Sequence, residues 1–244
     1  MIEKGDVAIC PLSELDEPSE FFNEVKSLNK AIASSLNLVF IPFGSYAAGT
    51  FLYPQSDLDL LCVGNDVHSG GALRELCREY KSLGVTTETH GDMIQLVLDQ
   101  RPRVDIVPAR MLSECECLTK SNGVWLHSSP LTHAQQFRIC NENSSGLAAL
   151  AVRQIKLHAV NSGLTIKGFL IQIVVKHVIE SGANTLEAVL AHAKQCFRFS
   201  DFAFIENGPS IAPLTQSQAA CELRRLSAVI LDPSNPSLLR SLNH

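Results

Sequence analysis

Two aspartates spaced two residues apart are the first feature of this sequence that could do chemistry. The segment Ser56-Asp57-Leu58-Asp59-Leu60 leads into an apolar run that is typical of a buried strand. Side chains two apart on a strand share a face, so Asp57 and Asp59 should project together while the leucines beside them pack into the core. Carboxylates this close repel each other unless water or cations separate their charges. Solvated acids on a strand edge are the plainer alternative, but hard oxygen ligands in an apolar setting favour Mg²⁺ or Mn²⁺.

A third acid, Asp105, stands among apolar residues on a strand expected over Arg103 to Val107, which we expect Pro108 to end. A single aspartate in a strand is usually structural. If this strand lies beside the first, however, three carboxylates converge and could hold two divalent cations. Such a pair of cations activates an attacking oxygen and stabilises a leaving one.

A glycine and a serine, Gly44 and Ser45, directly follow an expected strand over residues 37–43. Glycine allows the backbone to turn sharply, and Ser45 should open a short helix. Exposed N–H groups at a helix start, together with a hydroxyl, suit a phosphate group. Alone the pattern is weak, because Gly-Ser after a strand is more often just a turn.

The elements that must position these residues alternate between helix and strand in the first half of the chain. Apolar spacing predicts helices over 18–36 and 73–83, and strands over 37–43, 57–63, 85–89, 93–98 and 103–107, with a hairpin turn at 90–92. The second half is mainly helical, with helices expected over 131–140, 145–161, 166–181, 185–195 and 216–231. Residues 196–205 could be a short strand pair or an apolar loop, and the tail from residue 232 should be a surface extension.

This alternation predicts an α+β fold with two lobes: a mixed-sheet lobe over residues 1–112 and a smaller, mainly helical lobe over residues 113–244. Ligand sites favour the interface between such lobes.

Composition narrows the classes of partner. The 244 residues carry a net charge of −5 with a pI of about 5.9, whereas proteins that grip long nucleic acids usually carry a basic excess. A local basic patch remains possible. The N-terminus does not resemble a secretory signal and no apolar run could span a bilayer, so we expect a cytoplasmic protein without a membrane partner. The eight cysteines lack zinc-site spacing; even Cys115 and Cys117 have no second ligand pair, which favours reduced thiols.

The order of Gly44-Ser45, Asp57-Leu58-Asp59 and a later Asp105 resembles the polymerase-beta-type nucleotidyltransferase superfamily. The resemblance implies a catalytic site in which Asp57 and Asp59 bind two magnesium or manganese ions. Asp105 would help to hold the catalytic metal and would draw the acceptor hydroxyl toward deprotonation. Gly44 and Ser45 would contact the triphosphate.

Further segments resemble one branch of that superfamily, which includes archaeal-type CCA-adding enzymes, oligoadenylate synthases, poly(A) polymerases and bacterial cyclic-oligonucleotide synthases. They are 44–50, 56–59, 104–109, 125–130 and 151–156. In this branch a helix lysine, here Lys156, reaches the triphosphate, and the helical lobe closes the nucleotide cleft. The chain is shorter than most such relatives and carries Gln172 where many have an acid.

The expected function is therefore a metal-dependent, template-independent nucleotidyltransferase. It would move a nucleoside monophosphate from an NTP, ATP or GTP, to a hydroxyl and release pyrophosphate. We expect another nucleotide as the acceptor, giving a cyclic or linear oligonucleotide signal. An RNA 3′ end as acceptor (tRNA CCA addition or tailing), a non-catalytic nucleotide-binding module and a partner-binding protein with surface acids remain open, as do nucleobase preference and oligomeric state.

Overall fold

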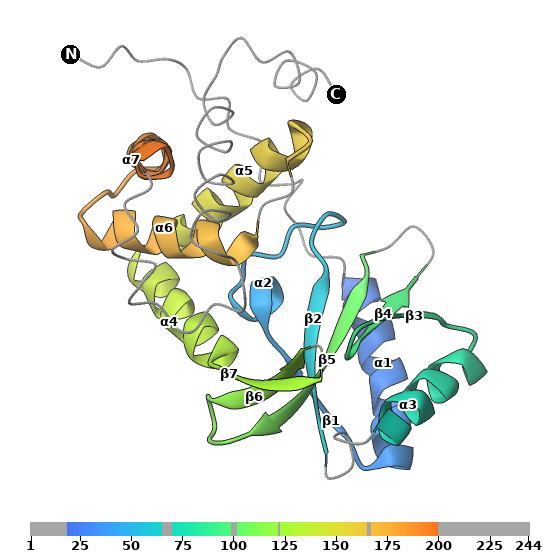
Figure 1. Ribbon diagram of the computed structural model, residues 1–244. Coiled ribbons are helices and arrows are strands. Elements are labelled where there is room, and N and C mark those ends of the chain that lie inside the picture. The colour runs from blue at the N-terminus through green and yellow to red at the C-terminus, as the bar shows by residue number, and fades with distance from the viewer. Residues whose placement is uncertain (1–18, 65–69, 99–101, 122, 165–166, 200–244) are drawn as a thin grey trace, which may run out of the picture. The chain divides into compact units, whose positions relative to one another are not determined.

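The computed structural model describes residues 19–64, 70–98, 102–121, 123–164 and 167–199 (Figure 1). These residues belong to two compact units that divide between Gln135 and Gln136. We call the part up to Gln135 the sheet unit and the part from Gln136 the helical unit.

The described residues contain seven helices and seven strands. The helices are α1 (Ser19–Leu36), α2 (Gly44–Ala47), α3 (Gly70–Ser82), α4 (Pro130–Asn143), α5 (Leu147–Asn161), α6 (Gly168–Glu180) and α7 (Leu186–Phe199). The strands are β1 (Val39–Pro42), β2 (Leu58–Val63), β3 (Thr86–His90), β4 (Met93–Val97), β5 (Val104–Met111), β6 (Cys117–Ser121) and β7 (Val124–Ser128). The predicted helices and strands up to residue 195 are confirmed, with ends shifted by a few residues.

The strands of the sheet unit form one mixed sheet. Its order is β1-β2-β5-β4-β3, and the hairpin of β6 and β7 joins it through pairing of β6 with β5. Only β2 and β5 are parallel among these pairs; the others are antiparallel. The predicted α+β class with a mixed sheet is therefore confirmed.

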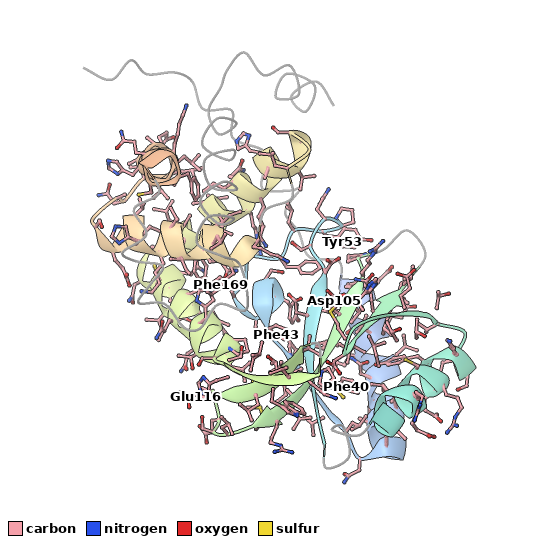
Figure 2. The ribbon with its side chains drawn as sticks, in the orientation of Figure 1. Phe40, Phe43, Tyr53, Asp105, Glu116 and Phe169 are labelled. Carbon is pink, nitrogen blue, oxygen red and sulfur yellow. The ribbon has the colours of Figure 1, made fainter. Side chains whose placement is uncertain are left out.

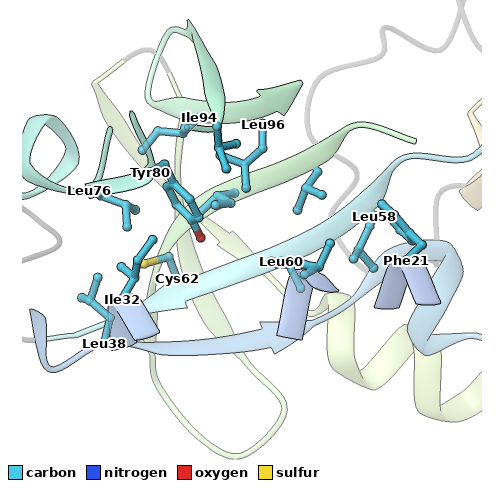
Figure 3. Packing of buried hydrophobic residues seen from close by; sticks show 14 of the residues in the cluster. Phe21, Ile32, Leu38, Leu58, Leu60, Cys62, Leu76, Tyr80, Ile94 and Leu96 are labelled. Atoms are coloured by element: carbon cyan, nitrogen blue, oxygen red, sulfur yellow. The ribbon is translucent and has the colours of Figure 1, made fainter. Parts of the chain in front are cut away.

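One face of the sheet carries the main apolar core. Alternation along β2 directs Leu58 and Leu60 into a cluster that includes Phe21 of α1 and Tyr80 of α3 (Figure 3). The Tyr80 hydroxyl donates a hydrogen bond of 2.5 Å to Asn29 Oδ1, which ties α3 to α1. The opposite face therefore receives every second residue of the same strands, including the acids.

That opposite face is apolar further along the strands. Leu61, Ala109 and Cys117 are fully buried there in a second, smaller cluster. The acids thus lie at the ends where β2 and β5 begin, and apolar side chains cover the face beyond them.

Pro108 does not end its strand, contrary to the prediction. β5 continues to Met111, and Pro108 lies opposite Cys62 of β2. On the other side of β5, pairing with β4 stops at Ile106 and pairing with β6 starts at Ala109. Among the described strands, no antiparallel partner lies opposite Pro108. The N–H that proline lacks therefore removes no hydrogen bond to an antiparallel strand at this position.

The hairpin of β6 and β7 was not predicted. It extends the sheet beyond residue 112, where we expected the first lobe to end. At its tip, Ser121 pairs with Val124, and between them the sequence reads Asn122-Gly123. Asn-Gly is a strong signal for a two-residue hairpin turn, so the sequence did contain the clue.

The described part of the helical unit consists of α5, α6, α7 and the second half of α4. Residues 196–199 continue α7, so both predicted alternatives, a strand pair and an apolar loop, are wrong for these four residues. Phe197 is fully buried. Residues 200–205, the predicted helix over 216–231 and the tail lie outside the described residues. In the part of the chain that the structure describes, no helix has the length and apolar character needed to cross a membrane.

Six described cysteines are free thiols. Cys62 and Cys117 are fully buried, and burial raises the pKa of the Cys62 thiol to about 12. A thiol this hard to ionise is a poor nucleophile and metal ligand, and Cys62 packs in the core as a small apolar residue.

Candidate active site

Two of the three predicted acids lie side by side on parallel strands. The register of β2 and β5 places Asp59 directly opposite Asp105, and both side chains are half-buried. Just before this pair, the Leu58 N–H donates to the Arg103 carbonyl at 2.9 Å. Cross-strand partners point to the same face, so the two carboxylates project from the sheet together. Figure 2 shows Asp105 on β5, the central strand of this arrangement.

The remaining acid, Asp57, immediately precedes β2 and is exposed. It follows a turn that is closed by two hydrogen bonds: the Ser56 N–H donates to the Leu52 carbonyl at 2.7 Å, and the Leu52 N–H donates to Ser56 Oγ at 3.1 Å. The turn therefore fixes where the chain enters β2, and with it the position of Asp57 two residues before Asp59.

Gly44 packs directly against the Asp59 carboxylate. Its φ of +62° lies in the left-handed region, and the Phe43 N–H before it donates to the Asp59 carbonyl at 3.0 Å. A Cβ atom at Gly44 would stand 2.9 Å from Asp59 Cγ and closer still to Oδ2. Glycine is thus required twice, for the backbone turn and for the space that the carboxylate occupies.

Ser45 lies in α2, the four-residue helix that begins at Gly44, and is half-buried. Its carbonyl accepts hydrogen bonds from the Thr50 N–H at 2.8 Å and from Thr50 Oγ1 at 3.3 Å, which closes the loop from Gly44 to Thr50. The ring of the next residue, Tyr46, lies 4.4 Å from that of Phe22, at the edge of the main apolar core.

Two side chains that the sequence did not single out as site residues lie beside Asp105. Gln95 of β4 is its cross-strand partner and donates from Nε2 to Asp105 Oδ1 at 2.7 Å. Arg103 donates from Nη1 to Gln95 Oε1 at 3.0 Å. Gln95 is only 5 % exposed. A glutamine in a strand is a weak signal, and its relation to Asp105 becomes visible only once the register of β4 and β5 is known.

The carboxylates offer the hard oxygen donors that Mg²⁺ or Mn²⁺ prefers, and Gly44 leaves room beside one of them. Across the described residues, however, no group of three or more His, Cys, Asp or Glu side chains is gathered tightly enough to hold a metal ion. What the structure brings together is the pair Asp59 and Asp105, with Asp57 close by in sequence. The donor chemistry fits a divalent cation, and three-acid ligation remains a prediction.

Lys156 lies on α5 in the helical unit and is half-buried. It passes close to Gly168, the first residue of α6: a Cβ there would stand 2.8 Å from Lys156 Cε and 3.1 Å from Nζ. The ammonium group is therefore placed at the start of α6. Gln172, four residues further along that helix, is buried.

The Gly-Ser turn after β1 and the paired carboxylates of β2 and β5 are the features on which the resemblance to nucleotidyltransferases rests. Residues 19–126 match the family model described as a nucleotidyltransferase domain. The segment includes α1, the five-stranded core of the sheet and all three predicted acids. The predicted superfamily and the predicted enzyme class are thereby confirmed for this domain.

Solved structures of cyclic-oligonucleotide synthases share the fold of the chain. CdnG from Bradyrhizobium diazoefficiens, solved with GTP, has a TM-score of 0.66 at 15% identity, covering 91% of this chain and 91% of that one. CdnC from E. coli MS115-1, solved with ATP, has a TM-score of 0.61 at 18% identity, covering 96% and 92%. A c-di-GMP synthase, CdnE from Capnocytophaga granulosa, has a TM-score of 0.64 at 13% identity, covering 87% and 81%. No curated protein matches the sequence.

Proposed function

We propose that this protein is a metal-dependent, template-independent nucleotidyltransferase that moves a nucleoside monophosphate from an NTP to a hydroxyl group and releases pyrophosphate. The observation that carries the proposal is the register of Asp59 against Asp105, with Gly44 packed on the Asp59 carboxylate. Gly44 leaves space for one carboxylate, and the strand register places a second carboxylate beside it. Because the two negative charges repel, this arrangement lowers the stability of the sheet, which argues against a purely structural role for the acids.

The roles of the residues follow from their chemistry. Asp57, Asp59 and Asp105 would hold two Mg²⁺ or Mn²⁺ ions. When bound, such ions neutralise phosphate charge and stabilise the attacking and leaving oxygens. Asp105 would orient the acceptor hydroxyl and take up its proton. Gly44 and Ser45 would bind phosphate oxygens through backbone N–H groups and the hydroxyl, and Lys156 would add a charge-assisted bond to the triphosphate. Catalysis would rest on positioning and electrostatic stabilisation.

For the acceptor, we favour a second nucleotide, so that the product is a cyclic or linear oligonucleotide. Two observations support this choice. The structures that share the fold include a cyclic dinucleotide synthase and proteins solved with GTP and ATP. The chain also carries a net charge of −5, which does not favour a long nucleic-acid acceptor. ATP or GTP is the expected donor.

The test is incubation of the full chain with the four ribonucleoside triphosphates and Mg²⁺ or Mn²⁺, with products resolved by mass spectrometry. We expect short oligonucleotides and pyrophosphate, and none from Asp59→Asn or Asp105→Asn. Magnesium-dependent binding of NTP without any product, with or without RNA, would indicate a non-catalytic nucleotide-binding module. Absence of both binding and product would contradict the proposal altogether.

A further inference from the structure

Gln95 joins Asp105 and Arg103 in one chain of hydrogen bonds. The residues Asp59, Asp105 and Gln95 form a single cross-strand row over β2, β5 and β4. Asp105 thus has a carboxylate on one side and an amide on the other. Arg103 lies two residues before Asp105 and so projects from the same face of the sheet.

The chemistry of these groups fixes the direction of both bonds. A guanidinium group only donates and an ionised carboxylate only accepts, so the amide between them must turn its NH₂ toward Asp105 and its oxygen toward Arg103. A flipped amide would lose both bonds at once. Arg103 therefore fixes the orientation of Gln95, and Gln95 in turn holds Oδ1 of Asp105 in one direction.

A buried glutamine at this position is not explained by packing alone. Its neighbours on β4, Ile94 and Leu96, are fully buried apolar residues on the opposite face, whereas Gln95 puts a polar amide at 5 % exposure. Burying an amide is costly unless its hydrogen bonds are made, and here the partner of its donor is the acid of the candidate site. We propose that Gln95 is a positioning residue for Asp105 and that Arg103 acts through Gln95 rather than on the substrate; the inference rests on the proposed function.

The contact itself can be tested without turnover. In metal-free protein labelled with ¹⁵N-glutamine, the side-chain NH₂ signal that is missing from Gln95→Leu belongs to Gln95. We expect Asp105→Ala to shift this signal and to speed its exchange with water. Leu96→Val is the matched control, because it changes the adjacent residue on the opposite face and should leave the signal in place.

Kinetics then separate positioning from simple structural support. For Gln95→Leu we expect kcat to fall about tenfold or more, because a bond to a charged group is lost, while KM for the NTP changes by less than about threefold. Leu96→Val should lose stability yet keep kcat per folded molecule. Arg103→Met should slow turnover less than Gln95→Leu, and Arg103→Lys should restore part of the rate because it keeps a donor.

A double-variant cycle decides how Arg103 acts. If it acts through Gln95, adding Arg103→Met to Gln95→Leu lowers kcat no further and leaves KM unchanged. A rise in KM from Arg103→Met in both backgrounds would instead place Arg103 on the triphosphate and overturn its part of the inference. The part of the inference about Gln95 would be overturned by either of two results. One is a Gln95→Leu variant that is as active as an active wild-type protein. The other is a Gln95 signal that does not change in Asp105→Ala. An inert wild-type protein would overturn the proposed function, and the inference about catalysis with it.

Discussion

At the scale of single residues, Gly44 shows how two demands meet at one position. Its positive φ and its contact with the Asp59 carboxylate each call for glycine. Gly49, five residues later, shares only the first demand: its φ is +70°, but a Cβ there would meet nothing within 4 Å. The pair allows backbone strain and steric displacement of the acid to be measured separately.

We predict that Gly44→Ala and Gly49→Ala each lower the free energy of unfolding by about 1 kcal/mol through strain at positive φ. Only Gly44→Ala should also reduce nucleotide transfer by more than about tenfold, because its methyl group displaces the Asp59 carboxylate. Denaturant unfolding and initial rates, both corrected for folded protein, check the two effects. Equal residual activity in the two variants would show that Asp59 tolerates displacement and would remove Gly44 from the site.

The acids themselves should differ in their effect on stability. Asp59→Ala and Asp105→Ala should each abolish transfer. Removing Asp59 relieves repulsion within the pair, so stability should stay level or rise. Removing Asp105 leaves the Gln95 amide buried without its acceptor, which should cost about 1–3 kcal/mol. Denaturant unfolding of the metal-free variants measures both; a rise in stability for Asp105→Ala would contradict the observed bond.

The three acids and Gln95 differ in how far the sequence alone could reveal them. Asp57, Asp59 and Asp105 could be singled out because carboxylates in apolar strands are uncommon and their spacing sets a common face. Gln95 could not, since its meaning depends on standing opposite Asp105, and pairing between strands is a property of the folded sheet.

At the scale of elements, the start of α6 and the side chain of Lys156 depend on each other. Gly168 leaves room for the end of the lysine chain, and nothing else about Gly168 requires glycine, because its φ is not positive. A larger residue would displace the flexible lysine rather than the backbone.

We therefore predict that Gly168→Ala weakens triphosphate binding while stability does not fall, since alanine favours helix over glycine. Lys156→Ala should weaken binding by a larger factor, because it removes the charge. Titration with a non-hydrolysable ATP analogue, beside denaturant unfolding, reads out both quantities. Unchanged affinity in both variants would leave Lys156 as a residue of the helix surface only.

Asp92 links two hairpins of the sheet unit. Its Oδ2 accepts from the Gly123 N–H at 2.6 Å, and Lys120 Nζ lies 3.2 Å from Oδ1. The hydrogen bond from Gly123 has the largest effect and lowers the pKa of the Asp92 carboxyl. Burial opposes it, and the hydrogen bond and charge of Lys120 add to the lowering, so the pKa lies below its ordinary value. The turn of β3 and β4 is thereby held to the turn of β6 and β7.

This link predicts a pH-dependent stability. Because the folded-state pKa lies below the ordinary value of about 3.9, the stabilisation is present above that pH and disappears as pH falls through the folded-state value. Asp92→Ala should therefore lower the free energy of unfolding by about 1 kcal/mol at pH 7 and by much less near pH 2. Glu88→Ala, at an exposed pair with His90, is the control and should change little. The same loss at both pH values would show that the carboxylate charge is not involved.

The elements also show which parts of the fold were open to prediction. Helices such as α1, and the hairpin of β3 and β4, carry their signals locally, in apolar spacing and a turn at Gly91. The continuation of β5 through Pro108 was not predictable in this way. It depends on a change of partner strand, from β4 to β6, that no local pattern records.

At the scale of the whole molecule, charge bears on the choice of acceptor. The net charge of −5 opposes binding of long nucleic acids, yet the described helical unit contains basic side chains such as Arg138, Arg153 and Lys194. One of the lysines there, Lys176, is already paired with Glu180 on the same helix at 2.7 Å. A local basic surface strong enough to hold RNA would have to overcome both the net charge and such internal pairing.

If the acceptor is another nucleotide, NTPs alone should give short oligonucleotides, and added tRNA should change neither the rate nor the products. An RNA-tailing enzyme would instead use several phosphate contacts, so its label transfer would depend on RNA and fall steeply as salt is raised. Transfer of radiolabel from each NTP, with and without total tRNA at low and moderate salt, distinguishes the two. We expect label in small products under all four conditions, with a modest dependence on salt because the phosphates of a single nucleotide offer few contacts. Label found only on RNA would contradict a nucleotide acceptor and would show that the same catalytic site acts on an RNA 3′ end.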